Sequence, residues 1–428
     1  MIRTLCMLVT LSFALFSNAT RVRAEELTMN RAVAVALERN RDVIAAKLDV
    51  ETAKFDEVEA GLYPNPVLGY SLGNLVLGNA NPQSPRISSP GFFGQTVNTL
   101  SVSEIIDVWG KRSARLRAAG RSIALQKLLT QDAIRQVVYA VRSAFADVVR
   151  LQSELALSRE TRERYDETVR LSRSRYSAGD ISEAELKKVE LEGLRYQNAE
   201  VGAGLELDLA RQRLAALLAM PSAEQLPAAL VASEDRHPSD ALGTLVDRAL
   251  AQRPDVLAAK QARWVSDAEL ARARREAYPD ISLGVSYTHS EFTASGDNPN
   301  TLGVGFSLPL PLFDRNQANI GRARVDQRRA QNEGLRLVLE VQHEVGEAYR
   351  RIAKAQKLLS VFEGGMLERA DSALKGAEKS YRAGGISLLE LLEAQRTYLQ
   401  TRAEYLGAVH DYLQATIDLQ HAVGAEVP

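Results

Sequence analysis

The sequence is short of three things: cysteine, aromatic residues and long apolar runs. Only one of its 428 residues is a cysteine, Cys6, and 6% are aromatic. A single cysteine excludes a disulfide within the chain and a metal site built from several thiolates. Beyond residue 24 no apolar run approaches the roughly 20 residues of a membrane-spanning helix. Any part that enters a bilayer must therefore do so as β-strands.

The first 24 residues have the composition of an export signal. Arg3 is followed by an apolar run of about a dozen residues, Leu5–Phe16, and Val22-Arg23-Ala24 offers a small-residue cleavage site. We expect residues 1–24 to be removed during export in a bacterium with two membranes. Cys6 lies inside this segment and outside a lipoprotein cleavage context, so we expect no lipid anchor.

The charge balance argues against one class of partner. Without the three arginines of the signal segment, 50 basic residues face 54 acidic ones, a formal charge of −4. A mildly acidic chain is not suited to bulk binding of nucleic acid or anionic lipid. With 25% charged residues and few aromatics, the composition favours a large helical protein over a compact all-β one.

The sequence contains a long internal repeat. Four matches recur in the same order over nearly all of the chain that follows the signal. An ordered set of this kind indicates duplication of one structural unit. The paired segments are 40–47 with 253–260, Tyr63-Pro64 with Tyr278-Pro279, 98–102 with 300–304, and 176–182 with 381–387.

Each repeat has the pattern helix, hairpin, very long helix, tight turn, helix. Ile134, Val138, Val141, Phe145 and Val148 step by four and three, which is the period of a coiled coil. A helix of about 67 residues extends roughly 100 Å, so the pattern predicts a rod with hairpins at one end and turns at the other. The first repeat is expected over 25–218, with helices near 27–61 and 182–218, a hairpin near 66–107 and the long helix near 109–176. The second is expected over 242–428, with helices near 242–277 and 387–423, a hairpin near 280–312 and the long helix near 315–380. Residues 219–241, rich in proline, serine and alanine, form a connector between them.

Both hairpins alternate apolar residues with small polar ones. In the second, Ile281, Leu283, Val285 and Tyr287 alternate with serine, glycine and threonine. The first is weaker, because Glu104 interrupts the returning strand near its end. At the tip of a rod no obvious layer covers the apolar face, so the pattern favours a lipid-facing wall around a wet lumen. The loops 75–96 and 291–299 are expected to face outside.

Four strands cannot close a barrel. Unpaired backbone groups at a strand edge are costly in lipid, so several copies must share one barrel. We therefore expect a mainly α-helical protein with a membrane β-barrel portion and obligate oligomerisation. Aromatic residues near the strand ends (Tyr63, Trp109, Tyr278 and Phe313) fit the membrane interfaces.

This duplicated unit behind an export signal resembles the TolC family of outer-membrane efflux proteins. The likeness covers essentially all of residues 25–425 and is most specific at Tyr381-Arg-Ala-Gly-Gly-Ile-Ser-Leu-Leu-Glu-Leu-Leu-Glu-Ala-Gln395. It implies a homotrimer with a twelve-stranded barrel, a twelve-helix periplasmic tunnel and an equatorial collar near 219–241. It also implies docking to a periplasmic adaptor (membrane fusion protein) and an inner-membrane RND-type pump. The implied protein is a passive conduit and not an enzyme.

Two further stretches are similar to the heavy-metal, CzcC-like branch of that family. They are Tyr63-Pro-Asn-Pro66 with Trp109-Gly-Lys-Arg112, and Leu308-Pro-Leu-Pro-Leu-Phe-Asp-Arg-Asn-Gln317. This resemblance implies metal cations or small toxic compounds as cargo. Two alternatives stay open: an outer-membrane component of type I protein secretion, and a soluble periplasmic coiled-coil scaffold.

The tight turn of each repeat carries candidate docking residues. Each has a glycine suited to the left-handed end of a helix, then a serine suited to the next N-cap, then a glutamate that completes a capping box. These are Gly179, Ser182 and Glu185 in the first repeat and Gly384, Ser387 and Glu390 in the second. By resemblance the turns also meet the adaptor, with docking tips Gly179, Asp180, Ile181, Gly384, Gly385 and Ile386.

Two acids near the second turn are candidates for a periplasmic gate. By resemblance, Glu390 and Glu393 match a pair of acids that ring the periplasmic entrance. Three copies on a narrow circle would attract cations. The alternative is that Glu390 only caps a helix and that Glu393 pairs with Arg396 on a solvated face.

Nothing in the sequence indicates a catalytic, metal-binding or cofactor-binding site. The five histidines (His237, His289, His343, His410 and His421) are scattered, and none lies four residues from another. We see no nucleophile triad, phosphate-cradling loop or HExxH motif. We therefore predict no catalytic residue, no metal site and no cofactor.

Overall fold

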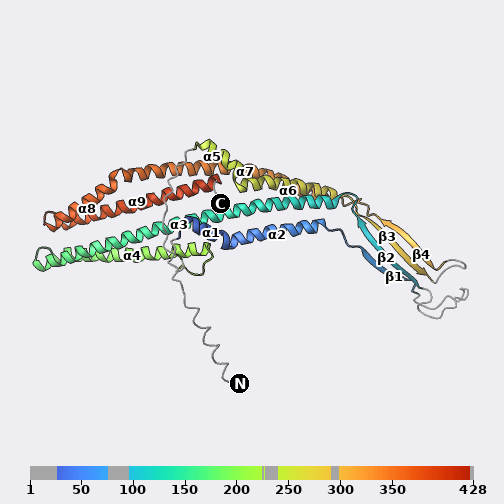
Figure 1. Cartoon of the computed structure of the whole chain (residues 1–428), viewed down its shortest axis with the longest axis horizontal. Helices are drawn as coiled ribbons and strands as arrows, with labels where there is room; N and C mark the ends of the chain where they lie inside the picture. The colour runs from blue at the N-terminus through green and yellow to red at the C-terminus, as the bar shows by residue number, and fades with distance from the viewer. Residues whose placement is uncertain (1–26, 76–95, 224–225, 227–239, 291–297, 425–428) are drawn as a thin grey trace, which may run out of the picture.

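The computed structural model describes residues 27–75, 96–223, 226, 240–290 and 298–424. Within them the protein is an elongated rod of helices that carries one sheet at one end (Figure 1). The expected signal segment with Cys6, most of the connector 219–241 and most of the two outer loops lie outside the described residues. No helix in the described part of the chain has the length and apolar character needed to cross a membrane.

The elements follow one another as two similar series. The first comprises α1 (Met29–Arg39), α2 (Arg41–Gly61), β1 (Val67–Gly73), β2 (Val97–Ile106), α3 (Lys111–Ala178) and α4 (Glu183–Leu217). The second comprises α5 (Leu242–Gln252), α6 (Pro254–Glu276), β3 (Ile281–Ser290), β4 (Asn300–Ser307), α7 (Gln317–Val361), a π-helical segment (Phe362–Met366), α8 (Leu367–Arg382) and α9 (Leu388–Val423).

The first helix of each series is broken, which corrects the single helices expected over 27–61 and 242–277. Asn40, between α1 and α2, has an extended backbone (φ −60°, ψ 132°), and its Oδ1 accepts the backbone N–H of Asp42 at 2.9 Å. At the matching place Arg253 is extended as well (φ −60°, ψ 126°), and Pro254 begins α6. Proline disfavours a helical conformation in the residue before it, so α5 cannot run on into α6.

The two long helices also differ from each other. α3 is continuous, but the long helix expected over 315–380 is interrupted by the π-helical segment Phe362–Met366. Gly365 within it has φ +101°, which residues with a side chain rarely adopt. The glycine pair Gly364-Gly365 therefore replaces one continuous helix with α7 and α8, joined at a kink.

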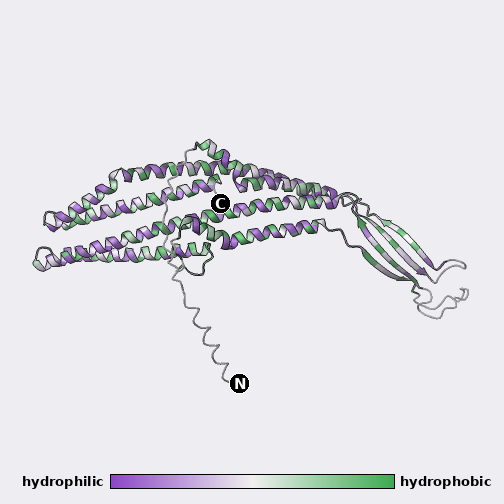
Figure 2. Ribbon diagram, in the orientation of Figure 1, coloured by the Kyte–Doolittle hydropathy of each residue, from purple (hydrophilic) through white to green (hydrophobic). Residues whose placement is uncertain are grey.

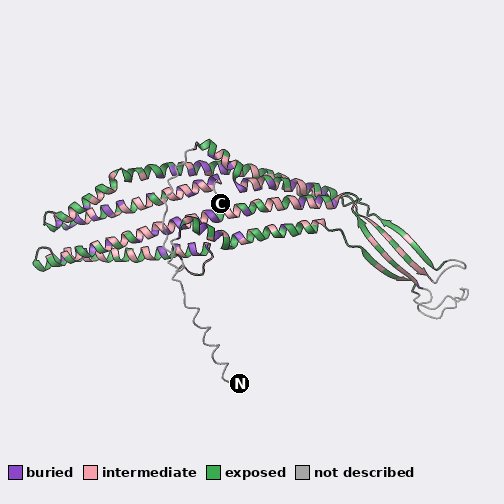
Figure 3. Cartoon of the chain, in the orientation of Figure 1, coloured by how far each residue is buried: buried purple, intermediate pink, exposed green. Residues whose placement is uncertain are grey.

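The helices lie side by side as a layer. In the half nearest the sheet the order is α2, α3, α6, α7, and toward the two turns it is α4, α3, α9, α8. Polar and apolar residues are interleaved along every helix (Figure 2). The buried residues lie where one helix packs against another (Figure 3). The two main apolar clusters lie where α1, α3 and α4 meet and where α5, α6, α7 and α9 meet.

The four strands form one antiparallel sheet in the order β1-β2-β3-β4. β2 continues through Glu104 to Ile106, so Glu104 does not interrupt the strand as we expected. Strand pairing uses backbone groups, and an exposed carboxylate does not prevent it. Among the described strands, β1 and β4 each keep one edge without a partner strand.

Candidate functional site

One face of the sheet is apolar and uncovered. Cross-strand rows run across all four strands, such as Tyr70–Leu100–Tyr287–Leu302 and Leu68–Val102–Val285–Val304. On the edge strand β4, Leu302, Val304 and Phe306 are 74%, 81% and 77% exposed. An apolar surface of this extent is stable only against lipid or a protein partner.

The opposite face of the sheet is small and polar. One row is Gly69–Ser101–Ser286–Gly303 and the next is Ser71–Thr99–Thr288–Thr301. A Cβ atom at Gly69 would lie 2.8 Å from Ser101 Oγ, and one at Gly303 would lie 2.8 Å from Ser286 Oγ. The glycines therefore allow serine hydroxyls to lie flat on this face, which suits a water-filled lumen.

The junction between sheet and helices is tied across the two repeats. Trp109 stacks on Tyr278 with ring centroids 4.9 Å apart, and its Nε1–H donates to Pro279 O at 2.9 Å. Next to this stack, Lys111 Nζ lies 2.7 Å from an oxygen of Asp280. Aromatic rings with nearby charges are typical of a membrane interface.

At the other end of the rod the two helical turns have the predicted geometry. Gly179 and Gly384 have φ of +81° and +76°, in the left-handed region. Both capping boxes are present, and in the second one Ser387 and Glu390 bond each other's backbone N–H groups. The predicted structural role of these residues is confirmed.

The predicted docking tips differ in how much of them is free to meet a partner. Asp180, Gly384 and Gly385 are exposed. Ile181 and Ile386 are only half-buried, and Ile386 packs against a small cluster that includes Tyr165, Tyr381 and Leu391. Ile386 therefore contributes to the protein's own packing, and Asp180 is an exposed charged group of the first turn.

The two candidate gate acids have different surroundings. Glu390 accepts the Ser387 N–H at 2.7 Å, and this bond lowers the pKa of Glu390 below its usual value. Glu393 is exposed, and among the described residues it makes no ion pair. The alternative pairing of Glu393 with Arg396 is not found among the described residues, where Arg396 lies 3.8 Å from Glu192 on α4. This arrangement leaves Glu393 free for a role at the entrance.

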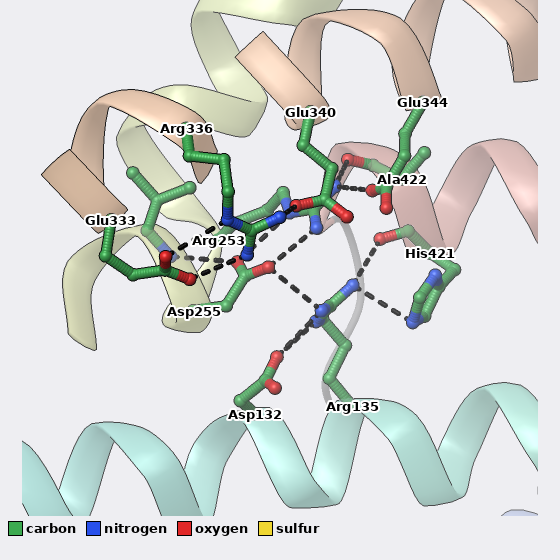
Figure 4. Close-up of polar contacts among 11 residues, drawn as sticks. Asp132, Arg135, Arg253, Asp255, Glu333, Arg336, Glu340, Glu344, His421 and Ala422 are labelled. Atoms are coloured by element: carbon green, nitrogen blue, oxygen red, sulfur yellow. Dashed lines mark hydrogen bonds and ion pairs between the residues drawn. The ribbon is translucent and has the colours of Figure 1, made fainter. Parts of the chain in front are cut away.

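Sequence reasoning missed a polar cluster at mid-length (Figure 4). Arg253, 2% exposed, contacts Asp255 at 2.6 Å and Glu344 at 2.5 Å and donates to Ala422 O. Burial raises the pKa of Asp255, but the hydrogen bond and charge of Arg253, the charge of Arg135 and the Val256 N–H together outweigh burial and hold that pKa below its usual value. The only signal in the sequence was Arg253-Pro-Asp255, which we used for the repeat alone.

Among the residues that the structure describes, no group of three or more histidine, cysteine or acidic side chains is arranged to hold a metal ion. His289 contacts Asn300, His410 Nε2 contacts Asp147 at 3.0 Å, and His421 contacts Arg135. Each of these three histidines therefore contacts a residue of another element.

A helical rod that ends in a sheet with one apolar face, one polar face and two open edges defines a subunit of an outer-membrane channel with a helical duct. Comparison with known proteins supports this assignment. The chain belongs to the outer membrane efflux protein family, which matches residues 32–220 and 245–425. It is therefore an outer-membrane efflux channel protein, and the predicted fold class is confirmed.

Relatives and solved structures cover nearly the whole chain. The cobalt-zinc-cadmium resistance protein CzcC of Cupriavidus metallidurans is 26% identical over 94% of this chain and 91% of the relative. The pyoverdine export outer membrane protein OpmQ of Pseudomonas putida is 28% identical over 92% and 85%. The outer membrane channel CmeC of Campylobacter jejuni matches with a TM-score of 0.76 and 18% identity, over 92% of this chain and 85% of that one. This last likeness shows the shared fold.

Proposed function

We propose that three copies of this chain close one barrel and one helical tunnel, which together form a passive conduit across the outer membrane. The observation that carries the proposal is the sheet, whose apolar face is uncovered and whose two edge strands are unpaired. Open edges are not stable in lipid, so β4 of one copy pairs with β1 of the next. Three such sheets supply the twelve strands that the family resemblance implies.

The helical part supports the same closure. α2 and α7 lie at the two sides of the layer near the sheet, and α4 and α8 lie at the two sides near the turns. α2, α4 and α7 carry exposed apolar residues, including Phe55, Val201 and Val325. A ring in which every copy offers one side to the next leaves no side uncovered.

The partners follow from the place of the turns. In a channel anchored by the sheet, the turns at Gly179 and Gly384 lie deepest in the periplasm, where a periplasmic adaptor and an inner-membrane RND-type pump would engage them. Exposed Asp180 and the glycines around it provide the contact surface. Energy for transport comes from the pump, and the duct supplies no catalytic group. Anchoring rests on the barrel, without a lipid chain.

The proposed cargo is metal cations or small toxic compounds. Support comes from the relative named for cobalt, zinc and cadmium resistance. In the trimer the exposed Glu393 carboxylates form an acidic constriction that favours cations. A conduit needs no tight cation site, because strong binding would slow passage.

Membrane fractionation and a susceptibility assay test the proposal together. Wild-type protein is expected to need detergent for release from the outer membrane, and deletion of its gene is expected to raise sensitivity to cobalt, zinc, cadmium or small biocides. Release in aqueous buffer would contradict the channel and support the soluble scaffold. Unchanged sensitivity to all these compounds, with the channel present in the membrane, would contradict the proposed cargo alone.

A further inference from the structure

A small cavity lies where the helices of the two repeats meet, in the half of the rod that leads to the turns. Its lining comes from α3 and α4 of the first repeat and from α8 and α9 of the second, which run together toward Gly179 and Gly384 (Figure 1). The space inside it is about 20 Å³, which is enough for one group of the size of a water molecule. The cavity lies within a single copy, so it does not depend on the proposed ring of copies.

The walls of this cavity hold two polar atoms that lack a hydrogen-bond partner. Tyr165 is 2% exposed and Gln395 is 7% exposed, and both line the cavity. Neither Tyr165 Oη nor Gln395 Oε1 has a partner among the described residues, although Gln395 Nε2 donates to Thr168 Oγ1 at 3.4 Å. A buried polar group without a partner destabilises a fold, so two of them on one cavity indicate that another molecule bonds to them.

The lining of the cavity carries a negative charge. It contains two acids, Glu160 and Glu378, and one base, Arg164, which gives a formal charge of −1. Arg164 is neutralised by Glu160 on the same helix, 2.7 Å away. Glu378 on α8 is half-buried and makes no ion pair among the described residues. The cavity therefore keeps one unpaired carboxylate in the same lining as the two free acceptor atoms.

Tyrosine rings form another part of the wall. Tyr165 and Tyr196 have ring centroids 4.9 Å apart, and Tyr398 also lines the cavity. The face of an aromatic ring attracts a cation. Free acceptor atoms, an unpaired carboxylate and tyrosine rings in one lining therefore select a cation that carries N–H donors. An anion would meet a carboxylate and no unpaired base.

A larger hollow adjoins the cavity through two shared residues. Arg164 and Glu378 line both spaces, and the hollow has a volume of about 460 Å³. Leu171 and Leu391 make part of its wall apolar. Tyr381, which is 2% exposed, also lines the hollow and holds a third buried polar atom without a partner, its hydroxyl. The hollow therefore suits the carbon chain of a ligand whose charged end occupies the cavity.

We propose that the cavity and the hollow form one binding site for a small amphipathic amine, with the ammonium group in the cavity and the carbon chain in the hollow. An ammonium group has three N–H donors, and the cavity offers three free acceptors: Tyr165 Oη, Gln395 Oε1 and the Glu378 carboxylate. The site takes its walls from both repeats, so a bound amine stabilises the contact between them.

Calorimetric titration of the detergent-solubilised full chain with hexylamine tests the site. Hexylamine carries an ammonium group at neutral pH, and hexan-1-ol, which has the same carbon chain without the charge, is the matched ligand control. Wild-type protein is expected to bind hexylamine at least about tenfold more tightly than hexan-1-ol, because only the ammonium group pairs with the Glu378 carboxylate. Equal affinities for the two compounds, or no binding of hexylamine at millimolar concentration, would overturn the proposal.

Two variants test the residues of the site. Tyr165→Phe and Glu378→Gln are each expected to weaken hexylamine binding at least about tenfold, because each removes one acceptor of the ammonium group. The controls Tyr176→Phe and Glu368→Gln change exposed residues of α3 and α8 outside both linings and are expected to bind hexylamine as wild type does. Wild-type affinity in both Tyr165→Phe and Glu378→Gln would place hexylamine elsewhere and overturn the site.

A single ordered water molecule is the alternative occupant, because it also fits the cavity and bonds to Tyr165 and Gln395. A water that stays in place leaves no room for an ammonium group, so hexylamine would not change the melting temperature. The proposal predicts that hexylamine raises the melting temperature of wild type and of Tyr176→Phe, and raises that of Tyr165→Phe much less. An unchanged melting temperature for wild type would contradict the proposal in favour of a structural water.

This proposal and the proposed channel fail in different ways. A ring of copies that inserts into the membrane and exports its cargo, but does not bind hexylamine, would overturn the amine site alone. A chain that binds hexylamine in the expected order of variants, but stays monomeric in the membrane, would contradict the channel and leave the amine site supported.

Discussion

Arg135 on α3 donates from Nη1 to both the ring Nε2 and the backbone oxygen of His421 on α9, each at 3.0 Å. An arginine can only donate, so His421 Nε2 is the acceptor and the ring is neutral. Burial, followed by the charges of Arg135 and Arg253, lowers the pKa of His421 to about 4. The contact joins the long helix of the first repeat to the last helix of the second.

The first prediction concerns pH. Between pH 6.5 and about 4 the unfolded chain carries a proton on His421 that the folded chain does not. The free energy of unfolding therefore falls as pH falls through this window, by up to about 3 kcal/mol. His421→Gln is expected to flatten this dependence in thermal unfolding followed by circular dichroism. The exposed control His343→Gln is expected to keep it, and equal slopes for the two variants would contradict the assignment.

The second prediction concerns the mid-length cluster. Arg253→Met leaves Asp255 and Glu344 without their shared cation and is expected to cost about 3 kcal/mol of unfolding free energy. Arg351, an exposed arginine that pairs with Glu347 and lies 3.4 Å from Asp418 on α9, is the control. Arg351→Met is expected to cost less than about 1 kcal/mol. Similar melting temperatures for both variants would show that the Arg253 cluster contributes no more to stability than a surface ion pair.

The third prediction concerns docking. Asp180→Lys reverses an exposed charge at the first turn and does not touch the capping box of Ser182. Resistance to the exported compound is expected to fall to the level of the deletion strain, with unchanged amount and melting temperature of the protein. Asp166→Lys, which changes an exposed residue of α3 before the turn, serves as control. Full resistance in Asp180→Lys would remove this turn from the docking surface.

The fourth prediction concerns the entrance. Glu393→Gln removes an exposed charge that has no ion-pair partner among the described residues, and is expected to lower cation preference about twofold in single-channel recordings. Glu390→Gln is expected to loosen the start of α9 instead, because Glu390 accepts the Ser387 N–H. A reversal potential in Glu393→Gln equal to that of wild type would place the constriction elsewhere.

Local patterns in the sequence were enough for the general architecture. The alternation around Val285 predicted a two-faced strand, and the spacing from Ile134 to Val148 predicted the long α3. The glycine, serine and glutamate of each turn predicted its caps. These features depend on neighbours a few residues apart, so a single sequence contains them.

Features that depend on contacts between distant residues were not predicted from the sequence, or were predicted wrongly. The break at Asn40 is held by a distant partner, because Asn40 Nδ2 donates to Leu217 O, 177 residues away. The pairing of Arg396 with Glu192 joins two helices that the sequence cannot place together. Arg135 and His421 are 286 residues apart, and neither carries a motif.

The central claim is that the open sheet edges close against other copies in the membrane, and native mass spectrometry of detergent-extracted protein tests it most directly. The account predicts a single species of three copies that persists on dilution. Separation of the three copies is expected to abolish channel activity. A monomer that remains folded, extractable and bilayer-inserted at high dilution would contradict it.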